Sequence, residues 1–216
     1  MKTLIVAAVA AILMSANVLA MGPAPLAGHH HIGLHAGMWN QSTSTRTEVG
    51  IGGVSTSVGS NGGMGGITYG YWMSEGLALN VSVGGMATDI ETDAGISGVT
   101  SKTGSVAMIL IGAKQYFPAA TYGTRLRPFV SLAIGPFIGT QQETRAGLNV
   151  VTESRTEGAV GGQLGLGTDI RIGSRFLTSA MIAYNLMTDF DRAIGGSRNY
   201  SGAQFSFGVG IILGRM

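Results

Sequence analysis

The residues with the clearest potential for metal chemistry in this 216-residue chain are four histidines near its start, His29, His30, His31 and His35. Imidazole groups gathered at this density can hold a metal ion. Neighbouring residues of an extended segment point to opposite sides, however, so three consecutive histidines do not converge on one point. We therefore expect neither a metal site nor a cofactor here.

Three acidic residues alternate along the chain at Asp89, Glu91 and Asp93. In a continuing strand their carboxylates would project from one face, where they could bind divalent cations, or lipopolysaccharide through such ions. Acidic residues within a polar segment more commonly form a solvated loop. We interpret this group as a solvated acidic loop.

The chain offers little for catalysis. A serine nucleophile needs a histidine base and an acid beside it, and no histidine occurs after His35. A dinucleotide-binding fingerprint is also missing, because Gly165 and Gly167 are followed by Ile170 where the third glycine should stand. The sequence therefore predicts a protein that is not an enzyme.

Alternation with a period of two residues dominates the chain after residue 31. In the segment 158–172, apolar residues such as Val160, Leu164 and Ile170 take every second position, and small or polar residues lie between them. This period is that of a β-strand and not of a helix. The pattern predicts eight strands, at about 32–42, 64–73, 77–89, 103–117, 127–141, 157–172, 176–190 and 200–214.

The number of strands and the lengths of their connections indicate a closed barrel. An even number of antiparallel strands closes with both chain ends on one side, and outer-membrane barrels have short periplasmic turns and longer external loops. Here the longer, polar connections fall at about 43–63, 90–102, 142–156 and 191–199. The sequence therefore predicts an all-β fold, an eight-stranded antiparallel up-and-down transmembrane β-barrel with these segments as external loops.

The composition agrees with a wall that faces lipid. Charged residues make up 11% of the chain and hydrophobic residues 45%, so few groups are available to keep a soluble surface wet. The charges are scattered and nearly balanced, with a net charge of +2, which argues against nucleic acid as a partner. The strand at 103–117 leaves its facing open, because Val106, Met108 and Leu110 alternate with Ala107, Ile109 and Ile111.

The first twenty residues have the features of an export signal. Lys2 precedes an apolar run at 4–14, and Val18 and Ala20 supply small residues before a cleavage site. The run is shorter than the ~20 residues that a membrane-spanning helix needs. We predict a signal peptide at 1–20 that is cleaved after Ala20, a short periplasmic leader at 21–31 and an outer-membrane barrel domain at 32–216. The chain contains no cysteine for a lipid anchor or a disulfide.

Closure of these strands would gather polar side chains inside the barrel. Charges enclosed there must pair, because burial of an unpaired charge is costly. Eight strands leave room only for side chains or one small ligand, so we interpret these residues as a structural network, with a selectivity lining as the alternative. The predicted lumen network consists of Arg127, Gln163, Asp169, Arg171, Asn185, Asp189 and Gln204.

Aromatic residues lie mostly toward the ends of the predicted strands. Tyrosine and other aromatic rings form girdles at the two interfaces of membrane barrels. The predicted interfacial aromatics are Tyr69, Tyr71, Tyr116, Phe176, Tyr184, Phe190 and Tyr200.

Three segments resemble a known family. The segments 127–136 (RPFVSLAIGP) and 161–171 (GGQLGLGTDIR), with the glycine-alternating last strand, are similar to the small outer-membrane β-barrel domain of the OmpA-like, OmpX/OmpW-like and opacity-type porin group. The resemblance covers nearly the whole mature chain. It implies a location in the cell outer membrane, with membrane lipid, lipopolysaccharide and the outer-membrane assembly machinery as partners. We expect a monomer.

Three functions follow from these expectations. The leading hypothesis is a non-enzymatic outer-membrane barrel with a structural or surface-interaction role through its external loops, because side chains fill the lumen and the loops are polar. The alternative is a narrow channel for small or hydrophobic solutes, suggested by inward-facing Gly161, Gly165, Gly167, Gly208 and Gly210. A weaker alternative is a soluble periplasmic barrel that binds lipid in an apolar interior.

Overall fold

The computed structural model describes residues 26–41, 54–57, 61–95, 98–117, 126–146, 150–172 and 175–214. The predicted signal peptide and residues 21–25 of the predicted leader lie outside these residues. Among the described residues, no helix is long and apolar enough to span a membrane. The strands are β1 (His30–Gln41), β2 (Val54–Ser57), β3 (Asn61–Trp72), β4 (Leu77–Gly95), β5 (Gly98–Tyr116), β6 (Leu126–Ala146), β7 (Val150–Ile172), β8 (Phe176–Met187) and β9 (Gly202–Leu213).

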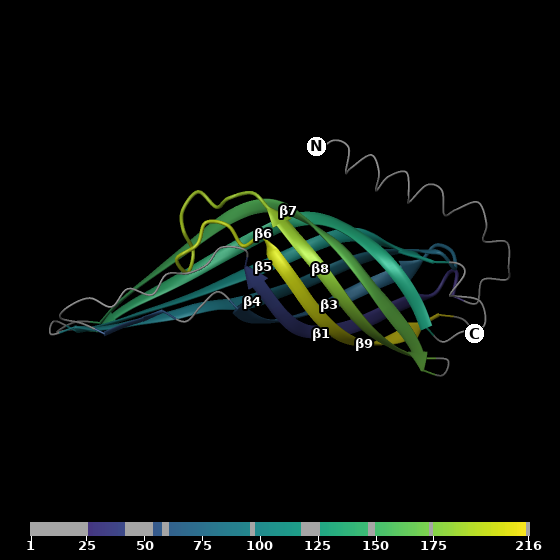
Figure 1. Cartoon of the computed structure of the whole chain (residues 1–216), viewed down its shortest axis with the longest axis horizontal. Coiled ribbons are helices and arrows are strands. Elements are labelled where there is room, and N and C mark those ends of the chain that lie inside the picture. Colours follow the sequence, from purple (N-terminus) through teal and green to yellow (C-terminus); the bar gives the residue numbers. More distant parts are fainter. Residues whose placement is uncertain are drawn as a thin grey trace.

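All of these strands except β2 form a closed antiparallel barrel (Figure 1). Strands β3 to β9 pair in chain order, and β1 closes the ring by pairing with both β3 and β9. The last strand runs the full length of the first, from Leu213 opposite His30 to Gly202 opposite Gln41. The predicted eight-stranded up-and-down barrel is therefore confirmed.

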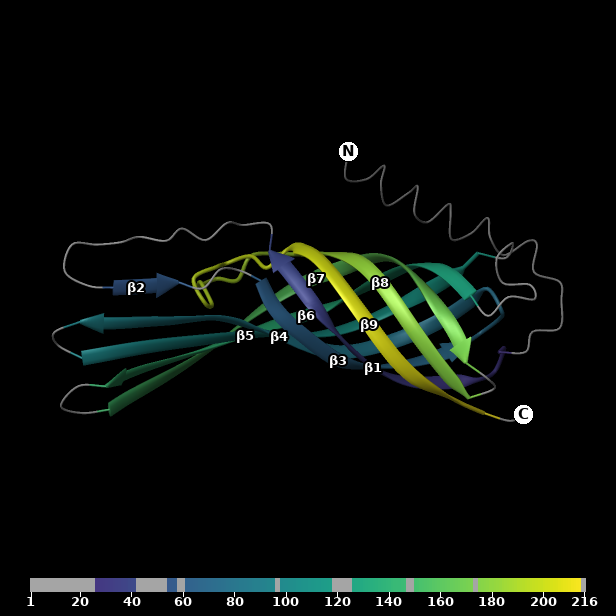
Figure 2. The same ribbon diagram turned by 60° about the horizontal axis from the view of Figure 1, so that its bottom comes forward.

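Four neighbouring strands, β4 to β7, continue far beyond the barrel (Figure 2). They have 19 to 23 residues, whereas β1, β3, β8 and β9 have 12 each. The short strand β2 joins this extension by pairing with β4. We call the barrel end that carries it the extension end, and the opposite end, where β1 begins and β9 ends, the terminal end.

The extension corrects two predictions of the sequence. The segments 90–102 and 142–156 were expected to be loops, but most of their residues belong to the β4–β5 and β6–β7 hairpins. The acidic group at Asp89, Glu91 and Asp93 accordingly lies in β4 and not in a loop; its side chains are outside the described residues. Beyond the membrane neither face of a strand needs to be apolar, so the alternation fades although the backbone pairing continues.

The outer wall of the barrel is apolar. Side chains such as Ile67, Ile134 and Leu166 are more than half exposed there. In β5, Val106, Met108 and Leu110 point inward and are at most 1% exposed, whereas Ile109 and Ile111 face outward. The closed barrel thus shows which side of β5 points into the lumen, which the sequence left open. An outward apolar surface is the pattern of a barrel in lipid and the inverse of a soluble barrel.

Two apolar clusters fill the lumen. The extension-end cluster includes Trp39, Phe137, Phe190, Ile194 and Tyr200, each fully buried. The terminal-end cluster is built from Leu26, Trp72, Ala78, Tyr116, Phe129, Leu177 and Ile212. Polar residues of the lumen lie around and between these clusters.

Candidate functional site

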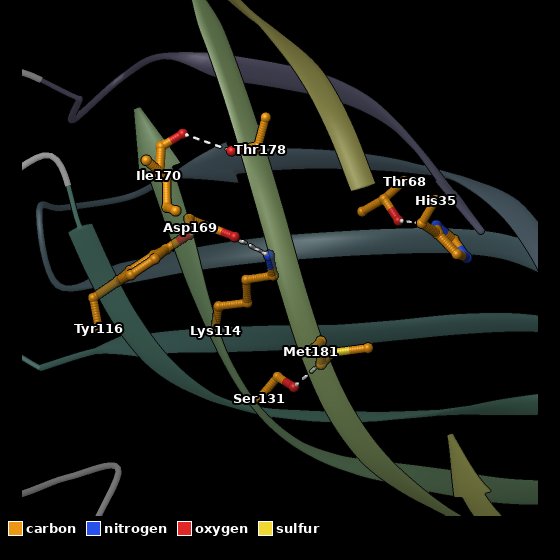
Figure 3. A network of polar contacts seen from close by, with 9 residues as sticks. All are labelled: His35, Thr68, Lys114, Tyr116, Ser131, Asp169, Ile170, Thr178 and Met181. Atoms are coloured by element: carbon orange, nitrogen blue, oxygen red, sulfur yellow. Dashed lines mark hydrogen bonds and ion pairs between the residues drawn. The ribbon is translucent and has the colours of Figure 1, made fainter. Parts of the chain in front are cut away.

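A buried ion pair stands at the centre of the lumen network (Figure 3). Asp169 of β7 is fully buried, and both of its carboxylate oxygens lie 3.3 Å from Nζ of Lys114 on β5. The hydroxyl of Tyr116 donates a hydrogen bond of 2.6 Å to the same carboxylate. The Lys114 ammonium also lies 4.1 Å from the centre of the Phe129 ring. The pair thus carries no net charge, as enclosure in a low-dielectric interior requires.

A second ion pair closes the terminal end. The Arg127 guanidinium donates to the Glu75 backbone carbonyl at 2.6 Å and lies 3.0 Å from the Glu75 carboxylate. That carboxylate also accepts the backbone N–H of Leu26 at 2.6 Å, and the Leu26 side chain is fully buried in the terminal-end cluster. Charge-assisted bonds of this kind are strong. Glu75 therefore holds Leu26, in the segment that precedes β1, inside the terminal end of the barrel.

Three carboxamides bond to one another on the inner wall. Gln163 Nε2 donates to Asn185 Oδ1 at 3.0 Å and to Gln204 Oε1 at 2.9 Å, and Asn185 Nδ2 donates to the same Gln204 oxygen at 2.9 Å. All three residues are buried. These bonds join β7, β8 and β9 inside the barrel. A network that satisfies buried polar groups makes the packing of these strands specific.

The structure places five of the seven predicted lumen residues in the interior, namely Arg127, Gln163, Asp169, Asn185 and Gln204. Arg171 is half-buried near the terminal end of β7. Asp189 is a wrong prediction, because β8 ends at Met187 and the exposed Asp189 side chain bonds to Asn199 in the following connection. Sequence reasoning missed Lys114 and Glu75. Lys114 follows a stretch that is apolar on both faces, and Glu75 lies in a turn.

Four of the predicted interfacial aromatics, Tyr69, Tyr71, Phe176 and Tyr184, are exposed on the outer wall. The predictions for Tyr116, Phe190 and Tyr200 are wrong, because all three side chains are completely buried in the lumen clusters. Tyr116 falls on the inward-facing side of β5. Phe190 and Tyr200 lie in the β8–β9 connection, which turns back into the barrel.

Neighbouring histidines point to opposite sides, as expected. His30 faces outward with its Nδ1 2.6 Å from the Tyr69 hydroxyl, whereas His31 is buried inside with its ring against Trp72. His35 also lines the lumen, with its Nδ1 3.3 Å from the Thr68 hydroxyl. In the part of the chain that the structure describes, no group of three or more His, Cys, Asp or Glu residues could hold a metal ion.

The β8–β9 connection, residues 188–201, forms an ordered lid over the extension end. Its own hydrogen bonds include Phe190 N–H to the Arg198 carbonyl at 2.7 Å and the Tyr200 hydroxyl to the Ile194 carbonyl. The lid is held to the barrel by Trp39 Nε1, which donates to the Tyr200 carbonyl at 3.1 Å. Phe190 and Ile194 pack over Gly139 of β6, where a Cβ atom would lie 2.9 Å from Ile194. Residues 191–199 were predicted to be an external loop, and the segment that contains them is partly inserted into the lumen.

Between the two clusters the lumen contains a chamber of about 80 Å³. Its lining includes Met108 and Ala133 of the extension-end cluster and Phe129 and Leu177 of the terminal-end cluster. Lys114 also lines the chamber. The arrangement can hold a few small molecules but offers no wide passage.

Comparison with known proteins agrees with this architecture. No family model matches the chain, and no curated protein matches it. Among solved structures, Ail, the attachment invasion locus protein of Yersinia pestis, is 13% identical, with 87% of this chain and 99% of that chain covered and a TM-score of 0.53. Neisserial surface protein A is 12% identical, with 86% and 97% covered and a TM-score of 0.51. This chain has the fold of the small outer-membrane β-barrels.

The small outer-membrane barrel fold accounts for the inverted distribution of side chains. Hydrocarbon surrounds the apolar outer wall, and every backbone group within the bilayer must bond to a neighbouring strand, which a closed barrel provides. The predicted resemblance is therefore correct at the level of the fold. A likeness at this identity carries no residue of either protein over to this chain.

Proposed function

We propose that this protein is a surface-interaction barrel of the bacterial outer membrane, and that its extension binds an external polypeptide by strand addition. The observation that carries the proposal is the edge of β7. Strand β6 pairs with β7 from Val150 onward, but β8 pairs with it only from Gly161 to Ile172. One edge of residues 150–159 is therefore unpaired by any described strand.

An unpaired strand edge is a template for another strand. Its free N–H and C=O groups bond to an added segment, and side chains on alternate positions give the contact its specificity. The edge ends at Val160, whose backbone groups bond to Thr188. Residues 152–156 are exposed, and Glu153 and Arg155 lie among them. Charges on an edge discourage indiscriminate pairing, so a partner must complement them.

The filled lumen favours a role at the cell surface over transport through the barrel. Apolar clusters fill both ends of the barrel among the described residues, and ion pairs hold the interior together. A narrow channel, the alternative function, would require both clusters to move. The names of Ail, the attachment invasion locus protein, and of Neisserial surface protein A refer to attachment and to the cell surface. The proposal gives this chain a role of the same class.

The test removes residues 150–154, half of the unpaired edge, without touching the barrel. Residues 142–154 are replaced by an Asn-Gly turn, which joins Gln141 to its cross-strand partner Arg155 in a shorter hairpin. Purified protein in lipid nanodiscs is applied to an array of extended ten-residue peptides, and intact cells are tested for adhesion to serum-coated plates. We expect the shortened hairpin to weaken both signals strongly, because half of the edge is missing. Ser131→Ala, a small change inside the lumen, is the control and should leave them unchanged.

The opposite result would contradict the proposal. If the shortened hairpin binds and adheres like the unaltered protein while Ser131→Ala abolishes adhesion, the function resides in the lumen. Hydrogen exchange in the unaltered protein tests the mode of binding. If the shortened hairpin loses peptide binding, but the amides at 150–159 of the unaltered protein exchange equally fast with and without bound peptide, the extension does not bind by strand addition.

A further inference from the structure

The chamber between the two lumen clusters has a mixed lining, in which uncharged hydrogen-bonding groups stand among apolar side chains. Hydroxyls of Thr68, Ser82, Ser131 and Ser206 border it, together with the carboxamides of Asn80 and Gln163. These groups can both donate and accept hydrogen bonds. Apolar side chains such as Met108, Leu110 and Phe129 complete the lining and can pack against the carbon atoms of a guest.

Two buried polar atoms of the lining residues lack a partner. Asn80 Oδ1 and His31 Nδ1 form no hydrogen bond with any described residue, and the two side chains are 9% and 3% exposed. Buried polar groups are nearly always bonded, and an exception calls for a molecule that supplies the missing partner. Because Asn80 lines the chamber, a hydroxyl group placed there can donate to its carbonyl oxygen.

The charge of the site restricts what that molecule can be. Lys114 is the charged residue of the lining, and its ammonium is already neutralised by Asp169. A charged guest would bring an uncompensated charge into an enclosed space, which is unfavourable. The neutral hydroxyls and carboxamides favour an uncharged guest with several hydroxyl groups.

The volume fixes the size of the guest. A water molecule needs about 10–15 Å³ of such space, so 80 Å³ corresponds to about five to eight water-sized positions. We propose that the chamber is a binding site for one small uncharged polyol, with a size like that of glycerol or erythritol. We expect a hexitol, which has twice as many carbon and oxygen atoms as glycerol, to exceed this space.

The lid at 188–201 is the entrance to this site. It is held by hydrogen bonds such as Gly195 N–H to Gln141 Oε1 at 3.0 Å and by packing of Ile194 over Gly139. The terminal end, in contrast, is closed by the Arg127–Glu75 ion pair and the anchored Leu26. The chamber is therefore reached from the extension end and has no exit at the terminal end, which makes it a binding site rather than a pore.

The experiment uses the methionines of the chain as probes. Protein labelled with ¹³C at the methionine methyl groups is placed in nanodiscs, and glycerol, erythritol and sorbitol are titrated separately. Met108 and Met181 line the chamber, whereas Met38 is exposed on the outer wall and Met73 lies in the exposed β3–β4 turn. We expect saturable shifts of Met108 and Met181 with glycerol and erythritol, half-saturated at roughly millimolar concentration as suits so small a ligand. Met38 and Met73 should not move.

A variant tests the role of the unpartnered oxygen. Asn80→Val should weaken glycerol binding by about tenfold, as expected for loss of one buried hydrogen bond. Asn40→Val, at an exposed position of β1, is the matched control and should bind like the unaltered protein. Shifts that grow linearly, that occur equally at Met38, or that are absent with both polyols would show that the chamber contains water only and overturn the proposal. Equal binding of sorbitol would overturn it as well.

Discussion

Replacing Lys114 by methionine leaves the Asp169 carboxylate buried without its cation. Asp169 is completely inaccessible, and its other bond is the 2.6 Å contact from the Tyr116 hydroxyl. Breaking a buried ion pair on one side typically costs 3–5 kcal/mol. Because Tyr116 still donates to the carboxylate, we expect the lower end, a loss of about 3 kcal/mol in the free energy of unfolding.

Substitution of the other partner, Asp169, should lower the free energy of unfolding by less. Asp169→Asn leaves the Lys114 ammonium without its counter-ion, but the Lys114 side chain is 12% exposed and so less completely buried than the Asp169 carboxylate. We expect a loss of about 1–2 kcal/mol. In the double variant Lys114→Met with Asp169→Leu no charge remains unpaired, so its loss should be smaller than the sum of the single losses by about 2 kcal/mol.

Urea unfolding of the protein reconstituted in lipid vesicles measures these free energies. Arg155→Met, at an exposed site of the extension, is the control and should change stability by less than about 0.5 kcal/mol. The reasoning is refuted if Lys114→Met costs less than about 1 kcal/mol, or if the effects of the two positions simply add. Either result would mean that Asp169 is not held as a buried charge.

Three further predictions concern the fold and the lid. Gly70→Ala should cost about 2 kcal/mol in urea unfolding, because its methyl group would overlap the His31 ring, whereas Gly63→Ala, with no atom within 4 Å, should be neutral or slightly stabilising; equal effects would contradict this. Gly139→Leu should push Ile194 and Phe190 away and speed amide exchange at 188–201 by about tenfold or more, and an unchanged rate would show that the lid is not held there; Gly158→Leu, in open space, is its control. Protein from the outer-membrane fraction should migrate differently on gels before and after boiling, as a closed barrel does; a soluble protein without a shift would contradict the membrane location.

The class of fold could be predicted from the sequence because strand periodicity is local. The alternation at 158–172 requires only that successive side chains point to opposite faces, which holds for any strand. The same argument placed Arg127, Gln163, Asp169, Asn185 and Gln204 on the inner side. It also separated His30 from His31, which point outward and inward.

Other features depend on how the strands meet. Lys114 and Asp169 are 55 residues apart and become partners only through the register of β5, β6 and β7. The extension escaped prediction because outside a membrane the pattern of side chains no longer has to alternate. The segment 188–201 has the composition of an ordinary loop. Its residues Phe190, Ile194 and Tyr200 are buried only because the extension end of the barrel offers a space for their side chains.

The sequence by itself determined the strands and which side chains share a face, since both follow from the geometry of one extended chain. The tertiary structure decided which face meets lipid in β5, which charges pair, how far β4 to β7 extend and what fills the lumen. These properties arise from burial and from contacts between distant residues, which exist only when the barrel has closed.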